Sequence, residues 1–284
     1  MKAKRQKENQ IPKIILYTVR ITQFFSTSLV TKLAARIFTT PIKHKTPNRE
    51  LIMDQKTKQE IVFVPKINKK IVVYHYGTNG KKVLLVHGWS GRGTQLVKFA
   101  DELIKLGYST ISFDAPAHGK SSTTTTLMPE FIACILELEK LYGPFESAVG
   151  HSLGGMALLN SVKQGLQIKK LAVIGSGDKV EDILHEYVKR LELKPIVAAK
   201  MSALFEKRFN EPMENYASHL AAKQVNIPTL IIHDENDNEV PVFCAKNIYK
   251  NLPNGELLIT KRLGHRKILG DATVIDKTIN FIKI

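Results

Sequence analysis

The sequence predicts an α/β protein that has a mostly parallel central sheet, helices on both faces and a small helical cap. Three observations support this class. Beyond residue 60, short apolar β-rich runs alternate with helix-like patterns. These runs are almost wholly apolar, which is typical of parallel strands covered on both faces. One strand-free stretch, residues 178–223, interrupts the alternation, and we expect it to cap the carboxyl edge of the sheet, where ligand crevices open.

The length and composition restrict the possibilities further. The 284 residues fit one large α/β domain with a helical appendage, and the 43% of apolar residues suffice for a full core. Two cysteines, Cys134 and Cys244, cannot form a disulfide framework or a Cys-rich zinc site. Because no run of 18 uncharged apolar residues occurs, we expect no typical membrane-spanning helix.

The formal net charge of +16 is unevenly distributed. Residues 1–50 hold 11 Lys and Arg against 2 acidic residues, whereas residues 51–284 hold 31 against 24. A basic leader on an ordinary domain indicates a segment that meets an anionic surface and not a body built to read DNA. Zinc-finger spacing, RNP-like aromatic boxes and basic heptads are also absent, so we expect no nucleic-acid partner.

Residues 1–59 are predicted to form a basic leader that consists of a disordered start, an amphipathic helix and a linker. Apolar residues recur every three or four positions across residues 14–38, and the Ser-Thr-Ser at 26–28 could cap a second helix. Either this apolar stripe packs on the domain, which is the favoured interpretation, or residues 1–40 contact an anionic membrane surface peripherally. Residues 41–59 are the expected linker. No convincing export signal is present, so we expect a cytoplasmic location.

The main domain is expected to span residues 60–284. Two opening strands, at 61–65 and 71–76, precede a continuous apolar strand at 83–87. Alternation then predicts helices at 94–106, 130–142, 153–164, 242–252 and 272–284, and strands at 109–114, 147–150, 171–175, 229–234 and 256–260. Gly107 and Gly165 each follow a predicted helix, as glycines at helix ends do.

The strongest local signal is Gly150-His151-Ser152-Leu153-Gly154, which has the form G-x-S-x-G. A predicted strand ends at Gly150 and a helical pattern begins at Leu153. This strand–turn–helix context is the one that a nucleophile elbow requires, and it makes Ser152 the candidate nucleophile. The alternative is a glycine-rich connection without chemistry.

A nucleophilic serine needs a base, and the base needs a group that orients it. His265 follows the last strand, in the third position of the chain order Ser, Asp, His, and is the candidate base. Asp237 lies in the loop after the strand that finishes near Asp234, and is the candidate acid. Asp234 is expected to be a structural turn residue. Asp178, which follows the preceding strand, is the fallback acid.

Acyl transfer also needs N–H donors for the oxyanion. We expect these donors to be the backbone N–H groups of Leu153 and Trp89, with Ser90 as the second choice for the latter. The Trp89 ring and His151 are the expected substrate contacts, and His151, which precedes the nucleophile, is also expected to buttress the elbow. No metal-ligand spacing is present, so we expect neither a metal nor an organic cofactor.

Five motifs in order resemble those of the α/β-hydrolase fold family, in particular a bacterial branch of serine esterases and hydrolases: VLLVHGWSGRG (83–93), FDAPAHGKS (113–121), GHSLGG (150–155), HDENDNEVP (233–241) and LGHR (263–266). The resemblance spans roughly residues 71–284. It implies that Ser152 is the nucleophile, Asp237 the acid and His265 the base, and that the residue after Gly88 donates to the oxyanion. One departure is the turn at 115–118, where family members commonly carry an Arg.

The sequence therefore predicts a serine hydrolase that cleaves a small-molecule carboxylic ester through an acyl-enzyme. A thioesterase or lysophospholipase at a membrane surface is the first alternative, because the leader is basic. A hydrolase-fold binding protein without turnover is the second. The family resemblance fixes neither the substrate nor the oligomeric state.

Overall fold

The computed structural model describes residues 11–78 and 80–283. They form two compact units. One unit holds the central sheet and comprises Thr39–Lys179 and Glu214–Ile284, whereas the other is helical and comprises the described part of Met1–Phe38 together with Val180–Met213. Residues 1–10, for which the sequence predicts disorder, lie outside the described residues. The described residues of the predicted leader are thus shared between the two units.

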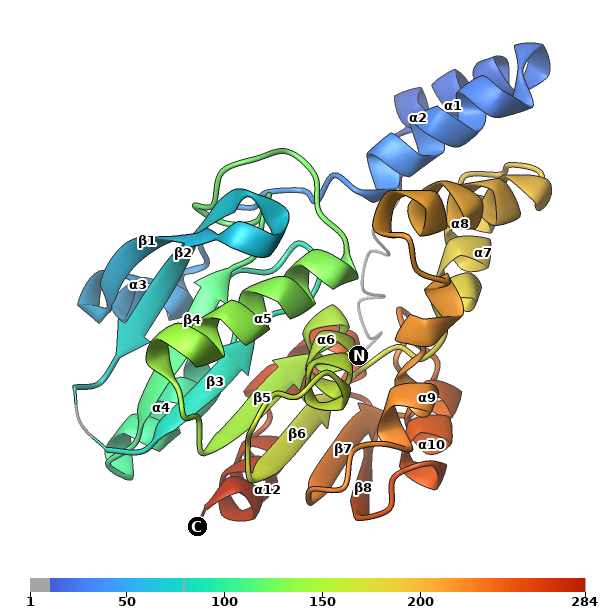
Figure 1. Cartoon of the computed structure of the whole chain (residues 1–284). Coiled ribbons are helices and arrows are strands. Elements are labelled where there is room, and N and C mark those ends of the chain that lie inside the picture. The colour runs from blue at the N-terminus through green and yellow to red at the C-terminus, as the bar shows by residue number, and fades with distance from the viewer. Residues whose placement is uncertain (1–10, 79, 284) are drawn as a thin grey trace, which may run out of the picture. The chain divides into compact units, whose positions relative to one another are not determined.

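The central sheet has eight strands, and it confirms the predicted fold class. In chain order the strands are β1 (Lys58–Val64), β2 (Lys69–Tyr76), β3 (Lys82–Val86), β4 (Ser109–Asp114), β5 (Ser147–His151), β6 (Lys170–Ile174), β7 (Thr229–Asp234) and β8 (Gly255–Thr260). Their order across the sheet is β1-β2-β4-β3-β5-β6-β7-β8 (Figure 1). The pairs β1–β2 and β2–β4 are antiparallel, and every pair from β4 to β8 is parallel.

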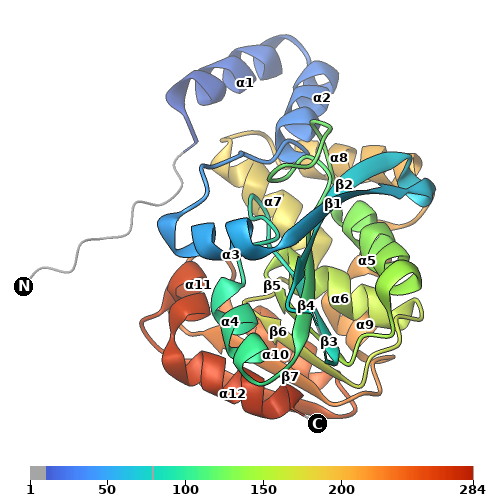
Figure 2. The same ribbon diagram turned by 90° about the vertical axis from the view of Figure 1, so that its left-hand side faces the viewer.

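Helices cover both faces of this sheet, as the apolar strands require. They are α3 (Leu51–Lys56), α4 (Val97–Lys105), α5 (Met128–Tyr142), α6 (Leu153–Lys163), α9 (Ser218–Ala222), α10 (Val242–Lys250), α11 (Gly264–Lys267) and α12 (Ala272–Ile282). The helices α4 and α12 contact each other on one face, while α5, α6, α9 and α10 follow one another across the other face (Figures 1 and 2). Apolar residues of β3, β5, β6 and β7 form a buried core with α4 and α12.

Two short helices differ from the sequence prediction. The helix α3 lies in the predicted linker, and α11 lies where a loop was expected. Six and four residues are too few to show a 3.6-residue period, so neither helix has a sequence signature. The segment around α3 is fixed by tertiary contacts instead, because Met53 is fully buried and the buried Glu50 accepts a hydrogen bond from the Thr94 hydroxyl at 2.8 Å. Short 3₁₀ helices occur at Asn48–Glu50, Pro65–Ile67, Met213–Tyr216 and Ile268–Gly270.

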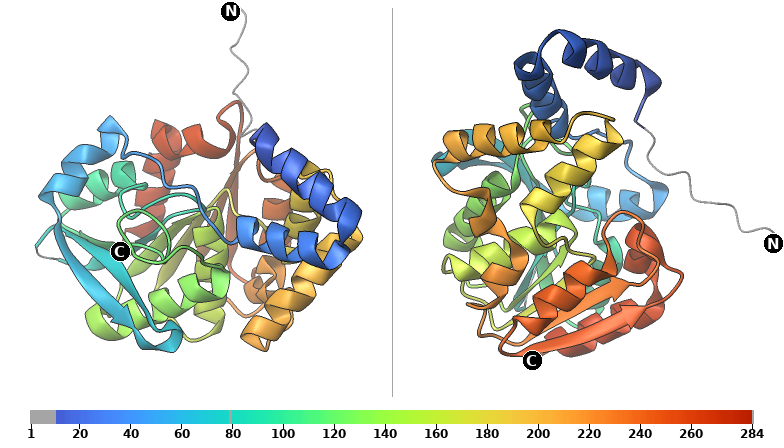
Figure 3. Two further views of the ribbon diagram at one scale, coloured as in Figure 1. Left: turned by 90° about the horizontal axis from the view of Figure 1, so that it is seen from above. Right: turned by 90° about the vertical axis from the view of Figure 1, so that its right-hand side faces the viewer.

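The helical unit combines two segments that lie far apart in the sequence (Figure 3). Its helices are α1 (Lys13–Phe25), α2 (Thr27–Phe38), α7 (Val180–Arg190) and α8 (Ile196–Phe209). Ser26 separates α1 from α2, and its hydroxyl accepts from the N–H of Leu29 at 3.3 Å, as the predicted cap requires. The Tyr187 hydroxyl donates to the carbonyl of Ala34 at 3.0 Å, which joins α7 to α2. None of the described helices is both long and apolar enough to cross a bilayer.

Candidate active site

Ser152, the predicted nucleophile, occupies the one-residue turn between β5 and α6. Its φ of 54° and ψ of −120° lie in a region that non-glycine residues rarely adopt. The surrounding backbone enforces this conformation. The Ser152 N–H donates to the carbonyl of Ile174 on β6 at 2.9 Å, and the Ser152 carbonyl accepts from the N–H of Gly155 at 3.0 Å. Backbone strain that is held in this way is characteristic of functional positions.

Close backbone approach explains two glycines next to the turn. A Cβ on Gly154 would lie 2.4 Å from the carbonyl oxygen of Val86, and a Cβ on Gly88 would lie 2.9 Å from the Cβ of Ser152. Neither side chain could be accommodated without moving the backbone. The start of α6 and the loop after β3 therefore lie directly against the candidate nucleophile.

His265 lies at the start of α11, and it contacts both of the other predicted triad residues. Its Nε2 lies 3.0 Å from the Oγ of Ser152, and its Nδ1 lies 2.7 Å from Oδ2 of Asp237. When the proton is on Nδ1, the imidazole donates to the carboxylate and accepts from the serine hydroxyl. The structure thus brings together three side chains from the segments that follow β5, β7 and β8, at the carboxyl edge of the parallel strands.

Asp237 is buried, and its carboxylate is fully engaged. Its Oδ1 accepts from the N–H groups of Glu239 and Val240, each at 2.8 Å, while Oδ2 faces His265. Burial alone would raise the pKa of Asp237, but the hydrogen bond with His265 and the two backbone donors outweigh burial and lower this pKa. Asp237 is therefore an ionised carboxylate in a fixed orientation.

Asp234, at the end of β7, organises the loop that carries His265. Its carboxylate accepts from the backbone N–H groups of Leu263 at 3.1 Å and Gly264 at 2.9 Å, and from the Thr260 hydroxyl at 2.8 Å. The sequence predicts a structural turn residue here, but it carries no sign of the contacts to the loop after β8. These contacts fix the backbone on which the candidate base depends.

His151 precedes the nucleophile, and its ring is buried beneath the His265 loop. Its Nε2–H donates to the backbone carbonyl of His265 at 2.9 Å, and the two rings lie 4.7 Å apart. Burial, together with the neighbouring imidazole, lowers the pKa of His151 to about 3, so the ring is neutral. The side chain is only 2% exposed, and its contacts are those of a residue that buttresses the site.

The loop after β3 contains the expected oxyanion donors. The N–H of Ser90, the second choice, donates to Nε2 of His118 at 3.0 Å and is therefore already used. The N–H of Gly88 donates to the side chain of Gln95 at 2.9 Å. Trp89 lies between these two residues, with its ring partly exposed. Leu153 is the first residue of α6, where backbone N–H groups have no partner inside the helix.

Asp178, the fallback acid, has other partners. Its carboxylate accepts from the backbone N–H and Nδ1 of His219, at 2.9 and 2.8 Å, and from the Asn247 amide at 2.5 Å. Its own contacts therefore do not include His265. The two candidate acids therefore differ in their partners, because of the two only Asp237 contacts His265.

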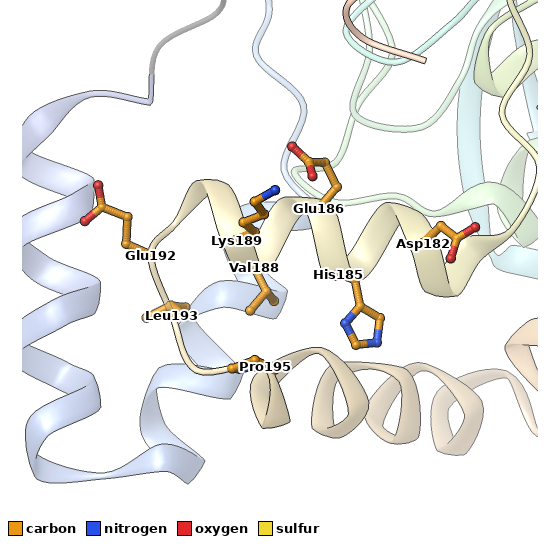
Figure 4. A pocket seen from close by; sticks show the side chains of 8 residues that line it. All are labelled: Asp182, His185, Glu186, Val188, Lys189, Glu192, Leu193 and Pro195. Atoms are coloured by element: carbon orange, nitrogen blue, oxygen red, sulfur yellow. The ribbon is translucent and has the colours of Figure 1, made fainter. Parts of the chain in front are cut away.

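A hollow of about 600 Å³ lies along α7 and the turn after it, within the helical unit (Figure 4). Its lining is mostly polar and exposed, and includes none of the predicted site residues; it consists of Asp182, His185, Glu186, Val188, Lys189, Glu192, Leu193 and Pro195. Within residues 11–78 and 80–283, no set of three His, Cys, Asp or Glu side chains is arranged to hold a metal ion.

This fold and this elbow define a hydrolase-like α/β protein, and comparison with known proteins agrees. The sequence profile of the alpha/beta hydrolase family matches residues 83–269, which is more than half of the chain. The chain therefore belongs to the alpha/beta hydrolase family.

Three similar proteins illustrate the relationship. The chain is 23% identical over 235 residues to the uncharacterized hydrolase YugF of Bacillus subtilis, covering 67% of this chain and 86% of that protein. It is 24% identical over 241 residues to the 2-hydroxy-6-oxononadienedioate/2-hydroxy-6-oxononatrienedioate hydrolase of Escherichia coli, covering 66% and 82%. Among solved structures, the esterase EaEST of Exiguobacterium antarcticum superposes with a TM-score of 0.62 at 18% identity, covering 80% of this chain and all of that one. This last similarity shows the shared fold.

Proposed function

We propose that this chain is a serine hydrolase that cleaves carboxylic esters through an acyl-enzyme. Ser152 is the nucleophile, His265 the general base and Asp237 the acid that orients it. The observation that carries the proposal is the 3.0 Å distance between Ser152 Oγ and His265 Nε2, which is within reach for proton transfer. The 2.7 Å contact between His265 and Asp237 supports the same roles.

In the acylation step, the Oγ of Ser152 attacks the ester carbonyl carbon while His265 Nε2 takes the hydroxyl proton. The oxyanion of the tetrahedral intermediate accepts hydrogen bonds from the backbone N–H groups of Leu153 and Trp89. Asp237 stabilises the imidazolium and keeps its orientation. The intermediate collapses when His265 gives its proton to the leaving alcohol, which leaves an ester on Ser152.

In the deacylation step, His265 takes a proton from water, and the resulting hydroxide attacks the acyl-enzyme carbonyl. The second tetrahedral intermediate collapses, the proton returns to Ser152 Oγ and the carboxylic acid leaves. The N-terminus of α6, behind Ser152, favours the negative charge that develops in both steps. These residues suffice for the whole cycle on a small-molecule ester.

A serine-directed fluorophosphonate probe and a p-nitrophenyl ester assay test the proposal. We expect the wild-type protein to be labelled and active, and Ser152→Ala to lose the label and to lose turnover by at least about 10³-fold. The Ser122→Ala variant, which changes an exposed serine outside the site, is the matched control and should keep both signals. Turnover by purified, folded Ser152→Ala at the wild-type rate would exclude Ser152 as the nucleophile.

A second candidate is a thioesterase or lysophospholipase that acts at a membrane surface. The exposed apolar side chains of α1 favour it, because they would hold the protein beside lipid substrates. A panel of esters, thioesters and lysophospholipids of graded chain length separates the candidates, and the substrates named for the Escherichia coli relative belong in the same panel. A preference for short water-soluble esters, without activation by vesicles, would favour the first candidate.

A binding protein without turnover is the alternative outside enzymes. The contacts that Ser152, His265 and Asp237 make with one another weigh against it, because such geometry has no evident use in a protein that only binds. The fluorophosphonate probe decides this point directly, since an unactivated serine would not be labelled.

A further inference from the structure

The helix α1 and the first turn of α2 expose an unusual amount of apolar surface. Six large side chains in this segment are between 57% and 86% exposed: Ile14, Tyr17, Ile21, Phe24, Phe25 and Leu29. Single exposed apolar residues are normal, but a contiguous group marks an interaction surface. We call these six residues, five of α1 and Leu29 of α2, the apolar face of α1.

The apolar face lies opposite the side through which α1 packs in the helical unit. Gln23 accepts from the backbone N–H of Lys194 at 2.7 Å, and Arg20 forms an ion pair with Glu192, which lies in the turn after α7. Ile14 and Gln23 are nine positions apart, which places them about 180° apart around the helix. The packing that holds α1 in its unit therefore leaves the apolar face exposed.

This finding bears on the favoured sequence interpretation, in which the stripe packs on the domain. The stripe has the period of a core-facing helix, but α1 packs through its other side. Val19, on that side, is fully buried. The three-to-four-residue period reports only that one side of a helix is apolar, and it does not say what covers that side.

Charge indicates what could cover the apolar face. The segment from Lys13 to Phe38 carries four basic residues and no acidic one, although one of the four, Arg20, is paired with Glu192, and residues 1–12 add four basic residues against one acidic. An apolar helix face flanked by cations is the pattern of helices that lie in the interface of anionic membranes. A second copy of this chain is a poorer occupant, because it would bring another formal charge of +16 towards the first.

We propose that α1, with the first turn of α2, lies flat on an anionic phospholipid membrane. The apolar face enters the boundary between headgroups and acyl chains, and the basic residues stay at headgroup level. The 13 residues of α1 extend about 20 Å, less than the roughly 30 Å of a bilayer core, so the helix lies on the membrane and does not cross it. This binding is independent of the proposed hydrolysis.

Vesicle flotation with the full-length protein tests the proposal. We expect the wild type to float with phosphatidylcholine vesicles that contain about 30% phosphatidylglycerol, and much less with pure phosphatidylcholine or in high salt. The double variant Phe24→Ser/Phe25→Ser should reduce vesicle partitioning by at least about tenfold, because it removes two rings that the membrane would bury. Phe243→Ser, which removes an exposed phenylalanine of the sheet-containing unit, is the matched control and should float like the wild type.

Three outcomes would overturn the proposal. The first is a wild type that does not float with anionic vesicles, and the second is a double variant that floats as well as the wild type. The third is a wild type that is a dimer in the absence of vesicles and that Phe24→Ser/Phe25→Ser converts to a monomer. Sedimentation velocity detects the third, and circular dichroism shows that the variants are folded. The Ser152→Ala variant should float like the wild type, which separates a failure of membrane binding from a failure of the proposed function.

Discussion

Two carboxylates, one at the end of β7 and one in the loop that follows, have different roles at the residue scale. Asp234 accepts hydrogen bonds from the loop after β8, and Asp237 faces the imidazole of His265. Burial would raise the pKa of each carboxyl, but hydrogen bonds outweigh it in both and lower the pKa. Position in the loop was enough to choose Asp237 from the sequence. The Asp234 contacts join residues about thirty positions apart, and no local pattern predicts them.

The Asp237→Asn variant tests the role of the charge at nearly constant shape. The side-chain amide introduced at position 237 would donate to Nδ1 of His265, which moves the ring proton to Nε2, so that the imidazole can no longer accept from Ser152. We expect ester turnover to fall by about 10³–10⁴-fold, in line with the loss known for the same change in the template Ser-His-Asp enzyme. Steady-state kinetics at neutral pH measures this loss.

The control for this change is Glu235→Gln, which removes an exposed carboxylate from the same loop. It should leave turnover close to that of the wild type. If Asp237→Asn kept more than a tenth of the wild-type activity in a folded protein, Asp237 would not be the orienting acid.

At the scale of elements, the two ends of the insertion between β6 and β7 are hydrogen-bonded to each other in the sheet-containing unit. The carbonyl of Asp178 accepts from the N–H of Ser218 at 3.0 Å, and the Ser218 hydroxyl donates to the carbonyl of Gly177 at 2.8 Å. The Asp178 carboxylate adds two bonds from His219 and one from Asn247. The point where the chain leaves the sheet and the point where it returns are thereby held together.

Asp178→Asn should therefore lower stability and leave the chemistry intact. Removing a buried, charge-assisted acceptor is expected to cost about 1–3 kcal/mol. That loss corresponds to a fall in Tm of about 2–4 °C per kcal/mol for a chain of this size. Differential scanning calorimetry measures the stability, and turnover of a short p-nitrophenyl ester measures the chemistry.

The Asp237→Asn variant is the reference for this experiment, because Asp178→Asn should lose stability whereas Asp237→Asn should lose activity. Activity of Asp178→Asn within about tenfold of the wild type is the expected result for a structural carboxylate. A loss as large as that of Asp237→Asn, in protein that is folded at the assay temperature, would make Asp178 a candidate catalytic acid again.

Long helices were predictable because burial of one side imposes a period on them, and the parallel strands were predictable because burial on both faces makes them short apolar runs between helices. The run 229–234 was predicted to the residue as β7, and the strand that became β4 likewise. The helices α3 and α11 were missed because they are too short for a period and are held by tertiary contacts. The pairing of α1 and α2 with α7 and α8 was also not predictable, because it joins segments about 150 residues apart.

At the scale of the whole molecule, buried neutral imidazoles recur along the carboxyl edge of the sheet. They follow or end β3, β4, β5 and β7: His87, His118, His151 and His233. Each donates from one ring nitrogen to a backbone carbonyl, and two of them also accept a backbone N–H at the other nitrogen. Burial is the main cause that lowers the pKa of all four, to about 2 for His118 and about 3 for His151. The loops that carry the candidate site therefore pack against imidazole rings that are neutral in the folded protein.

Because the folded state lowers these pKa values, the unfolded chain binds more protons below the unperturbed histidine pKa of about 6.5. Folding stability should consequently fall as the pH falls from about 6.5 towards 5, by up to about 1.4 kcal/mol per pH unit for each histidine that stays neutral over this range, as His118 and His151 do. Urea unfolding across this range measures the slope. His118 and His151 alone predict about two protons taken up on unfolding near pH 5.5, and His87 and His233 add to that number.

The His118→Gln variant isolates one of these protons. Glutamine can still accept from the N–H of Ser90, but it does not titrate, so the slope should decrease by about one proton whatever the change in absolute stability. His44→Gln, at an exposed position, should keep the wild-type slope. An unchanged slope in His118→Gln would mean that the imidazole at position 118 is protonated equally in the folded and unfolded chains. In that case the loop after β3, with its candidate oxyanion donor, could not depend on a neutral ring.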